Sequence, residues 1–384
     1  MSLQIAGMGW VTPLGRGVDP VWGRLIRGDE ASRQPISDPV SDKEYSAFRV
    51  PADALEDLPP HSRLRRASAI SRFAAAAGID ALIEARSTIG EINAERMALV
   101  FAVSNGGVIY TKRFYHNVVE AGAQSASPLL FPETVFNAPA SHLAAILGIT
   151  GASYTLVGDG AVGVLAMKMA SDLLDNGALE SCLVVGAEEA DWLLCDAYHK
   201  WRLLKKEPPI ELFRDPPRGT ILSEGAGAVL LARQGPVEID AIDAGGNFSQ
   251  RREAKKIVRR ILHNLADEQV CIISSANGTF IDLAEQKAIE RESASALVYS
   301  VKPALGESVG ASALWQVIAG AQGLRTKRLP QMPHLPQHIG LNFPASDEIA
   351  CTSAIILSCG LNQQAAGLRL RMDSRAPIVS GLSI

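Results

Sequence analysis

Short apolar runs alternate along the chain with alanine-rich segments whose apolar residues recur every three to four positions. The first pattern predicts buried strands and the second predicts helices that pack on them. The predicted strands span residues 3–9, 96–103, 153–158, 181–187, 227–233, 237–244, 269–275, 297–301, 351–358 and 367–372. The predicted helices span residues 66–85, 138–148, 163–177, 254–267, 282–293 and 312–324. Because the strands are continuously apolar, we expect an α/β fold whose sheets are covered by helices.

The run "ARQGPVEI" around residues 232–239 interrupts this alternation and divides the chain into two halves of similar texture. Each half carries a glycine-rich turn between an apolar strand and a helix, which indicates an internally duplicated architecture. The sequence therefore predicts two units, residues 1–235 and 236–384. The proline-rich stretch 324–348 breaks periodicity and is expected to form an irregular surface loop.

Bulk composition excludes several classes of protein. A net charge of −4 and a charged fraction of 20% give no basic footprint for nucleic acid. The five cysteines have no C-x-x-C spacing, so we interpret them as buried, reduced thiols rather than disulfides or metal ligands. No signal-peptide pattern and no apolar run of roughly 18 residues is present, so we expect a cytoplasmic chain without a membrane span. We also expect no cofactor.

The segment "YTLVGDGAVGVL" is a strand, a tight turn and a helix start, a shape that often presents a nucleophile. The apex here carries Asp159 and Gly160, so no nucleophile stands on it. Asp159 could act as an acid or base, or it could cap the following helix with its side chain. We favour the cap.

Six blocks in order resemble β-ketoacyl synthases, and they span nearly the whole chain. They are "IAGMGWVTPLGRG", "FNAPASHLAAILGITGASYTL", "VVGAEEA", "LFRDPPRGTILSEGAGAVLLAR", "ANGTFIDLAEQKAI" and "SVKPALGESVGASALWQVIAG". The resemblance implies a thiolase-like five-layer α/β/α/β/α fold with two pseudo-duplicated halves. It also implies a dimer that handles acyl chains on acyl carrier protein.

The resemblance implies a catalytic cysteine and two histidines, and this sequence departs at all three positions. They fall on Gly160, Asn277 and Glu307. Glycine cannot form a thioester, and an ionised glutamate would repel a developing oxyanion. The lysine and the acidic residue of the family motifs are kept as Lys302 and Glu285, and the phenylalanine that gates the family's pocket falls on Cys359.

Several polar residues near these positions can be given a structural or a functional role. Asn277 could hold a carbonyl or satisfy the backbone of its own turn. Glu307 could pair with Lys302, which we prefer, or form a two-carboxylate site with Asp159. His142 is expected to make a structural hydrogen bond. The basic residues at 255–260 form either a solvated helix face, which is commoner, or a surface for an acidic carrier.

The resulting hypothesis is a catalytically inactive β-ketoacyl synthase homologue that resembles chain-length factors. Such a chain would form a homo- or heterodimer with a ketosynthase and shape its acyl pocket in fatty acid or polyketide biosynthesis. Two alternatives stay open. One is an enzyme that acts on acyl thioesters through Asp159, Asn277 and Glu307, and the other is an acyl-binding protein without turnover.

Overall fold

The computed structural model describes residues 3–38, 42–65 and 67–372 of the 384-residue chain. Within these residues ten strands form one continuous path in the order β12-β11-β13-β14-β10-β1-β9-β7-β5-β6, and the short β2 (Gly15–Arg16) pairs with β1. The N-terminal strands are β1 (Leu3–Thr12), β5 (Met97–Val103), β6 (Ser153–Val157), β7 (Ser181–Glu188) and β9 (Gly225–Ala232). The C-terminal strands are β10 (Val237–Asn247), β11 (Val270–Ile273), β12 (Leu297–Tyr299), β13 (Ser353–Cys359) and β14 (Gln364–Met372).

The two halves of this path repeat one pairing pattern. In the first half β5 is parallel to β6 and β7, whereas β9 runs antiparallel to β7 and β1. In the second half β11 is parallel to β12 and β13, whereas β14 runs antiparallel to β13 and β10. The predicted duplication is thus visible in the topology. The proposed boundary at 235/236 itself stays a prediction, although it falls between β9 and β10.

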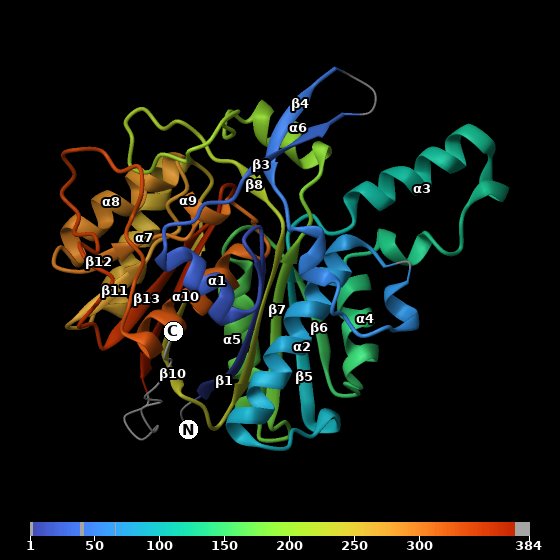
Figure 1. Cartoon of the computed structure of the whole chain (residues 1–384), viewed down its shortest axis with the longest axis horizontal. Coiled ribbons are helices and arrows are strands. Elements are labelled where there is room, and N and C mark those ends of the chain that lie inside the picture. The colour runs from blue at the N-terminus through green and yellow to red at the C-terminus, as the bar shows by residue number, and fades with distance from the viewer. Residues whose placement is uncertain (1–2, 39–41, 66, 373–384) are drawn as a thin grey trace.

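Helices lie between and outside the two halves of the sheet, as Figure 1 shows. Helices α5 (Val162–Asp175) and α10 (Ser312–Thr326) contact each other and strands of both halves, so they form the middle layer. Helix α2 (Ala69–Ile89) covers β1, β9 and β7, and α4 (Ala138–Leu147) packs on α2. Helices α7 (Ala254–Leu265) and α8 (Phe280–Glu292) lie side by side, and α7 packs on β10, β13 and β14. The expected five-layer fold is confirmed.

The middle layer is close-packed because glycine is placed where strands and helices meet. A Cβ on Gly163 of α5 would lie 2.3 Å from Leu314 Cδ2, and one on Gly227 of β9 would lie 2.8 Å from Leu314 Cβ. Such distances are below any real carbon–carbon contact, so a larger residue would push α10 away. The glycines of "SEGAGA" therefore pack against α10.

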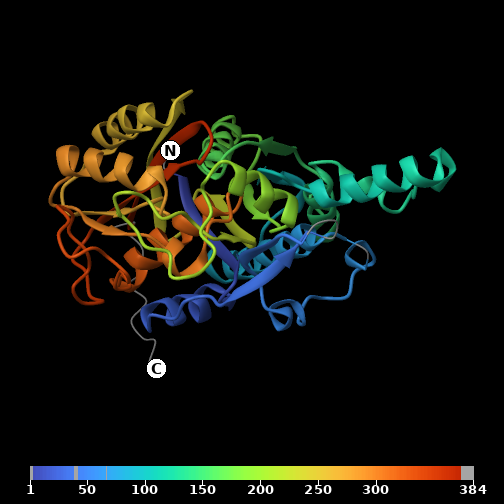
Figure 2. The same cartoon turned by 90° about the horizontal axis from the view of Figure 1, so that it is seen from above.

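Several elements were not predicted. They are α1 (Val18–Ile26), α3 (Val108–Ala121), α6 (Trp192–Lys200) and α9 (Lys302–Leu305), and a small sheet of β3 (Arg33–Ser37), β4 (Glu44–Phe48) and β8 (Leu222–Ser223). Helix α3 extends away from the body (Figures 1 and 2), and none of its residues is buried. Phe114 contacts the rings of Tyr115 and Phe131, and Lys112 Nζ lies 3.8 Å from the centroid of the Trp192 ring near the start of α6.

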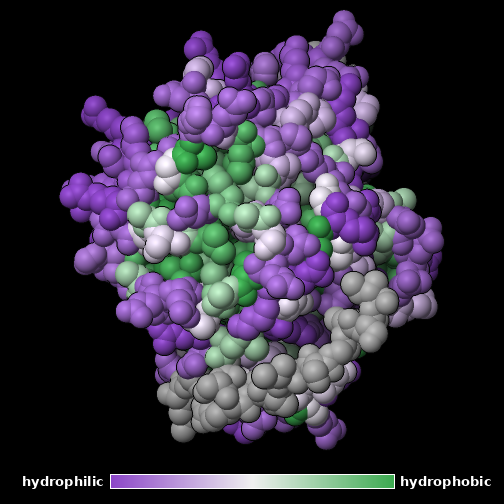
Figure 3. All heavy atoms as spheres, turned by 60° about the vertical axis from the view of Figure 1, so that its left-hand side comes forward, coloured by the Kyte–Doolittle hydropathy of each residue, from purple (hydrophilic) through white to green (hydrophobic). Residues whose placement is uncertain are grey.

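The structure also tests the expectations for the cysteines, for the proline-rich stretch and for membrane spans. All five cysteines are free and buried, as predicted. The irregular loop predicted over residues 324–348 is present but starts later, because α10 continues to Thr326. No helix within the described residues is long and apolar enough to cross a membrane. Viewed from the side of the C-terminal half, the surface is mainly hydrophilic, with apolar residues gathered near the middle (Figure 3).

Candidate functional site

The turn after β6 carries Asp159, whose predicted role as a helix cap is wrong. Helix α5 begins at Val162, its N-cap is Ala161, and no side chain caps it. The Asp159 carboxylate faces the other half of the molecule, where its Oδ2 accepts hydrogen bonds from the backbone N–H groups of Asn362 at 2.8 Å and Gln363 at 2.9 Å. The carboxylate thus satisfies the loop between β13 and β14 and leaves the start of α5 uncapped.

Gly160 lies at the apex of this turn and is buried. Its carbonyl oxygen accepts a hydrogen bond from Ser358 Oγ at 2.8 Å. A Cβ on Gly160 would lie 3.1 Å from Gly360 Cα, so the backbones of the two halves nearly touch here. The position has no side chain that could bind an acyl group covalently.

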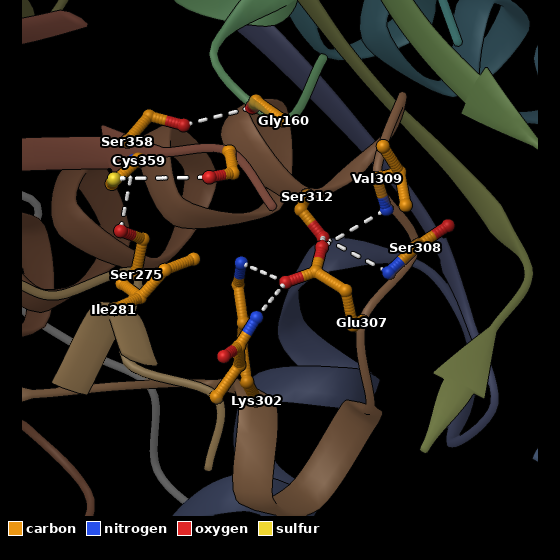
Figure 4. A network of polar contacts seen from close by, with 12 residues as sticks. Gly160, Ser275, Ile281, Lys302, Glu307, Ser308, Val309, Ser312, Ser358 and Cys359 are labelled. Carbon is orange, nitrogen blue, oxygen red and sulfur yellow. Dashed lines mark hydrogen bonds and ion pairs between the residues drawn. The ribbon is translucent and has the colours of Figure 1, made fainter. Parts of the chain in front are cut away.

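Glu307 is the centre of a buried polar network (Figure 4). Its Oε2 accepts from Lys302 Nζ at 2.5 Å and Asn277 Nδ2 at 2.7 Å. Its Oε1 accepts from Ser312 Oγ at 2.6 Å and the backbone N–H of Val309 at 3.0 Å. The ion pair between Lys302 and Glu307, preferred from the sequence, is present, and each side chain is only 2% exposed.

The charge state of Glu307 follows from these contacts. Burial alone raises the pKa of a carboxyl group, but the Lys302 ammonium and the hydrogen bonds more than offset this, and the pKa of Glu307 lies below its ordinary value. The carboxylate is therefore ionised and fully occupied by donors. A group in this state has no lone pair directed at a substrate.

The turn after Glu307 is strained in a way that supports the same network. Val309 has φ of 42°, in the left-handed region that β-branched residues rarely adopt. The N–H of the same residue donates to Glu307 Oε1. Strain of this kind persists only where the surroundings impose it. The carboxylate is therefore a structural part of this turn.

Asn277 satisfies its own turn, which is the second of its two predicted interpretations. Its Oδ1 accepts from Thr279 Oγ1 at 2.6 Å and from the Thr279 N–H at 3.3 Å, while its Nδ2 donates to Glu307. The residue is fully buried. Asp159 and Glu307 bond to separate sets of partners, so the contacts do not join them as a two-carboxylate site.

Glu285 and Cys359 are connected through Ser275. Glu285 bonds to the hydroxyls of Ser274 and Ser275, and burial raises the pKa of Glu285 to about 7. Ser275 Oγ in turn accepts from the Cys359 N–H at 2.9 Å. Burial also raises the pKa of the Cys359 thiol well above its ordinary value, so the thiol stays protonated and is a poor nucleophile.

Some residues of the network were missed from the sequence. Asp282 accepts from the backbone N–H groups of Asn277 at 2.8 Å, Gly278 at 3.0 Å and Phe213 at 2.7 Å. The spacing of Thr279 and Asp282 is a capping-box signal that could have identified it. Thr279 accepts from the Ile281 N–H at the start of α8. No sequence signal points to Ser275 or Ser312, since their roles arise only in three dimensions.

Two other predicted groups lie outside this network. His142 Nε2 bonds to Glu133 Oε1 at 2.6 Å, so the structural hydrogen bond predicted for it is confirmed. On α7, Lys255 and Lys256 are exposed, whereas Arg259 pairs with Glu292. No cluster of three or more His, Cys, Asp or Glu residues suited to a metal ion occurs in the part of the chain that the structure describes.

Comparison of the sequence with known proteins identifies relatives of this chain. A family model described as "Beta-ketoacyl synthase, N-terminal domain" matches residues 2–235, which is more than half of the chain. The 3-oxoacyl-[acyl-carrier-protein] synthase 2 of Vibrio harveyi is 24% identical over 59% of this chain, and the chain spans only 56% of that enzyme. The enzyme of the same name from Rhizobium meliloti is 25% identical over 85% of this chain and 87% of its own length.

Solved structures share the whole fold. The chain is similar to "The ishigamide ketosynthase/chain length factor", with a TM-score of 0.84 and 19% identity over 97% of this chain and 99% of that one. It is also similar to "Ketosynthase (ApeO) in Complex with its Chain Length Factor (ApeC) from Xenorhabdus doucetiae", with a TM-score of 0.79 and 19% identity over 97% and 98% of the two chains. With the thiolase-like fold and the matched family model, the chain belongs to the β-ketoacyl synthase family.

Proposed function

We propose that this chain is a catalytically silent member of the family that pairs with an active ketosynthase and shapes its acyl pocket. In this proposal Gly160, Asn277 and Glu307 stand where an active synthase has its cysteine and two histidines. Two observations support this proposal, one at the turn after β6 and one in the buried polar network. Gly160 offers no nucleophile, and Glu307 is an ionised carboxylate held by four donors.

The alternative of acid–base chemistry on thioesters has less support. A general acid or base must come within hydrogen-bond reach of the proton that it transfers. Glu307 is 2% exposed and saturated with donors, and Asp159 Oδ2 is occupied by two backbone N–H groups. Acyl binding without turnover is the remaining alternative, which mass spectrometry of a co-purified ligand would test.

A surface suited to a partner lies beside the elbow. Among the described residues strand β6 is the last of the sheet, so no further strand pairs with one edge of its backbone there. Of the large hydrophobic residues that are exposed among the described residues, most belong to β6 and to the segment from α3 to α4. They are Tyr115, Val119, Leu129, Phe131, Val135, Phe136, Tyr154 and Val157. We call this set the β6 face, and a concentration of this kind marks an interaction surface.

The similar solved structures support a paired assembly. Two of them carry a chain length factor in their printed titles, and a third is titled as a type II acyl-carrier protein in complex with its ketosynthase. At 15–19% identity these likenesses show the fold alone. Dimerisation through the β6 face, and recognition of an acyl carrier protein by the pair, are therefore part of our proposal.

The proposal is tested by co-expressing the chain with a cysteine-bearing ketosynthase and a carrier protein from the same genome. We expect the two condensing-enzyme chains to co-purify, and we expect product chain length to change when this chain is omitted. A stable homodimer of this chain that leaves every such synthase unaffected would argue against the proposal.

The purified chain is expected to form no acyl-enzyme. Incubation with radiolabelled acyl-carrier thioester should leave the polypeptide unlabelled after denaturing electrophoresis, because the elbow lacks a thiol and the described cysteines are buried. The cysteine-bearing synthase, treated in the same way, is the positive control. Label retained on this chain would show that another nucleophile operates.

The β6 face gives a second prediction. Val157 is 53% exposed, so Val157→Asp should leave the fold intact but weaken pairing about 100-fold or more, since it buries a charge in an apolar interface. The matched control is Leu283→Asp, because Leu283 is 37% exposed on α8 at the far end of the molecule. Analytical ultracentrifugation measures both. Equal pairing by the two variants would show that the β6 face is not the interface.

A further inference from the structure

The loop between β13 and β14, residues 360–363, is closed against the elbow by contacts from several elements. The Gly360 N–H donates to the Gln364 carbonyl oxygen at 2.7 Å, which closes the loop on itself. The Phe248 N–H donates to the Gln363 carbonyl oxygen at 2.6 Å, which fixes the loop to the end of β10. The residue before the loop, Cys359, is held through its N–H by Ser275.

The elbow holds the same loop through Asp159. Both hydrogen bonds to Asp159 Oδ2 come from backbone N–H groups of the loop, Asn362 and Gln363, which are themselves exposed to solvent. Hydrogen bonds to a charged acceptor are roughly twice as strong as neutral ones. Asp159, in the N-terminal half, thus provides a charged acceptor for two N–H groups of a loop in the C-terminal half.

The loop and the elbow are tightly packed. A Cβ on Gly360 would lie 2.0 Å from Asp159 Oδ2, so the carboxylate occupies the space that any side chain at 360 would need. A side chain at Gly160 would start 3.1 Å from Gly360 Cα. The loop backbone therefore covers the place where a side chain of the elbow would project.

We infer that Asp159 is a positioning residue that holds the 360–363 loop closed over Gly160 and keeps the elbow inaccessible. The closed loop is a built-in block at the position from which a nucleophile would act. It goes beyond the proposed silence of the chain, which rests on missing side chains. The contacts that close the loop all lie within one chain, so the block needs no partner protein.

A cysteine placed under the loop reports whether the loop is closed. Gly160→Cys introduces the reporter thiol, and Gly160→Cys/Asp159→Ala removes the carboxylate as well. We expect iodoacetamide to label the introduced thiol slowly in the first protein and about tenfold faster or more in the second, because loop opening becomes easier when its charged acceptor is lost. Peptide mass spectrometry resolves this site from the five native cysteines.

The control is Gly160→Cys/Asp172→Ala, in which the lost carboxylate is the exposed partner of Lys168 on α5. This variant should label at the rate of Gly160→Cys alone. A second measurement needs no reporter: in Asp159→Ala alone, hydrogen exchange should accelerate in peptides that cover residues 360–364 and stay unchanged on α7. Fast labelling of Gly160→Cys itself, or unchanged exchange in Asp159→Ala, would overturn the inference.

Discussion

Replacing Lys302 with methionine is expected to lower the free energy of unfolding by about 3–5 kcal/mol. Lys302 and Glu307 are each 2% exposed, and the Lys302 ammonium is the charged donor among the four that Glu307 has. Methionine fills a similar volume but leaves the carboxylate buried without a counter-charge. The loss therefore reflects an uncompensated charge more than lost packing.

Urea unfolding, followed by circular dichroism, measures this loss against two matched variants. In Lys302→Met/Glu307→Gln neither charge remains, so part of the stability should return, reduced by the cost of turning the glutamine N–H groups toward the Asn277 or Val309 donor. In Lys168→Met the partner is Asp172 on an exposed helix surface, and such pairs are worth less than about 1 kcal/mol. If Lys302→Met and Lys168→Met lose equal stability, Glu307 is not the ionised, desolvated group described above.

If the proposed function is correct, this dependence also means that one substitution would not give this site the catalytic groups of an active synthase. Exchanging Glu307 for histidine would remove the counter-charge of Lys302 and the acceptor for the Val309 N–H at once. Exchanging Gly160 for cysteine would place a Cβ 3.1 Å from Gly360 Cα. Gly160 and Glu307 are therefore both built into their surroundings as structural elements.

The sequence predicted those elements that a pattern of neighbouring residues defines. Continuous apolar runs marked the ten strands of the long path, and 3.6-residue periodicity marked the helices that cover them. The five-residue spacing of Lys302 and Glu307 on a short connection predicted their ion pair, which the structure contains. The buried thiols followed from the lack of C-x-x-C spacing and from the apolar runs around several of the cysteines.

What the sequence did not predict depends on contacts between the halves. Asp159 precedes a helix, which favours a cap, yet its carboxylate bonds to a loop about 200 residues later because the two halves meet there. The small sheet of β3, β4 and β8 pairs Phe48 with Ser223, and no local pattern reports so distant a partner. Helix α3, in which no residue is buried, was also not predicted.

Glu188, at the end of β7, gives the chain a stability that should fall as pH rises through neutrality. Its carboxyl group is fully buried and accepts from the backbone N–H groups of Ser104 at 3.0 Å and Gly106 at 3.2 Å, and also from that of Asn105. Burial raises the pKa of Glu188 to about 8, because the hydrogen bonds offset only part of the desolvation. The group is therefore protonated in the folded chain at pH values where it is ionised in the unfolded chain.

The sign of the pH effect follows from proton binding. Between the unfolded pKa of 4.5 and the folded pKa of about 8, the folded state binds one more proton than the unfolded state. The stabilisation is complete below 4.5 and is lost as pH rises through 8, at about 1.4 kcal/mol per pH unit within the window. Burial raises the pKa of Glu189 and of Glu285 to about 7, which gives slopes of the same sign. Stability should therefore be greatest in mildly acidic solution.

Urea unfolding at constant ionic strength from pH 5 to pH 8 measures this slope, and Glu188→Gln isolates the contribution of one group. The glutamine amide presents N–H groups to backbone N–H groups of the 104–106 turn, and this mismatch should cost about the same stability at every pH. A uniform loss leaves the slope unchanged, whereas removal of the titrating carboxyl group should flatten it by about 1.4 kcal/mol per pH unit. Glu120→Gln, on the exposed arm helix α3, should keep the parent slope. If Glu188→Gln keeps it too, then Glu188 is ionised in the folded chain, and its three N–H donors outweigh burial.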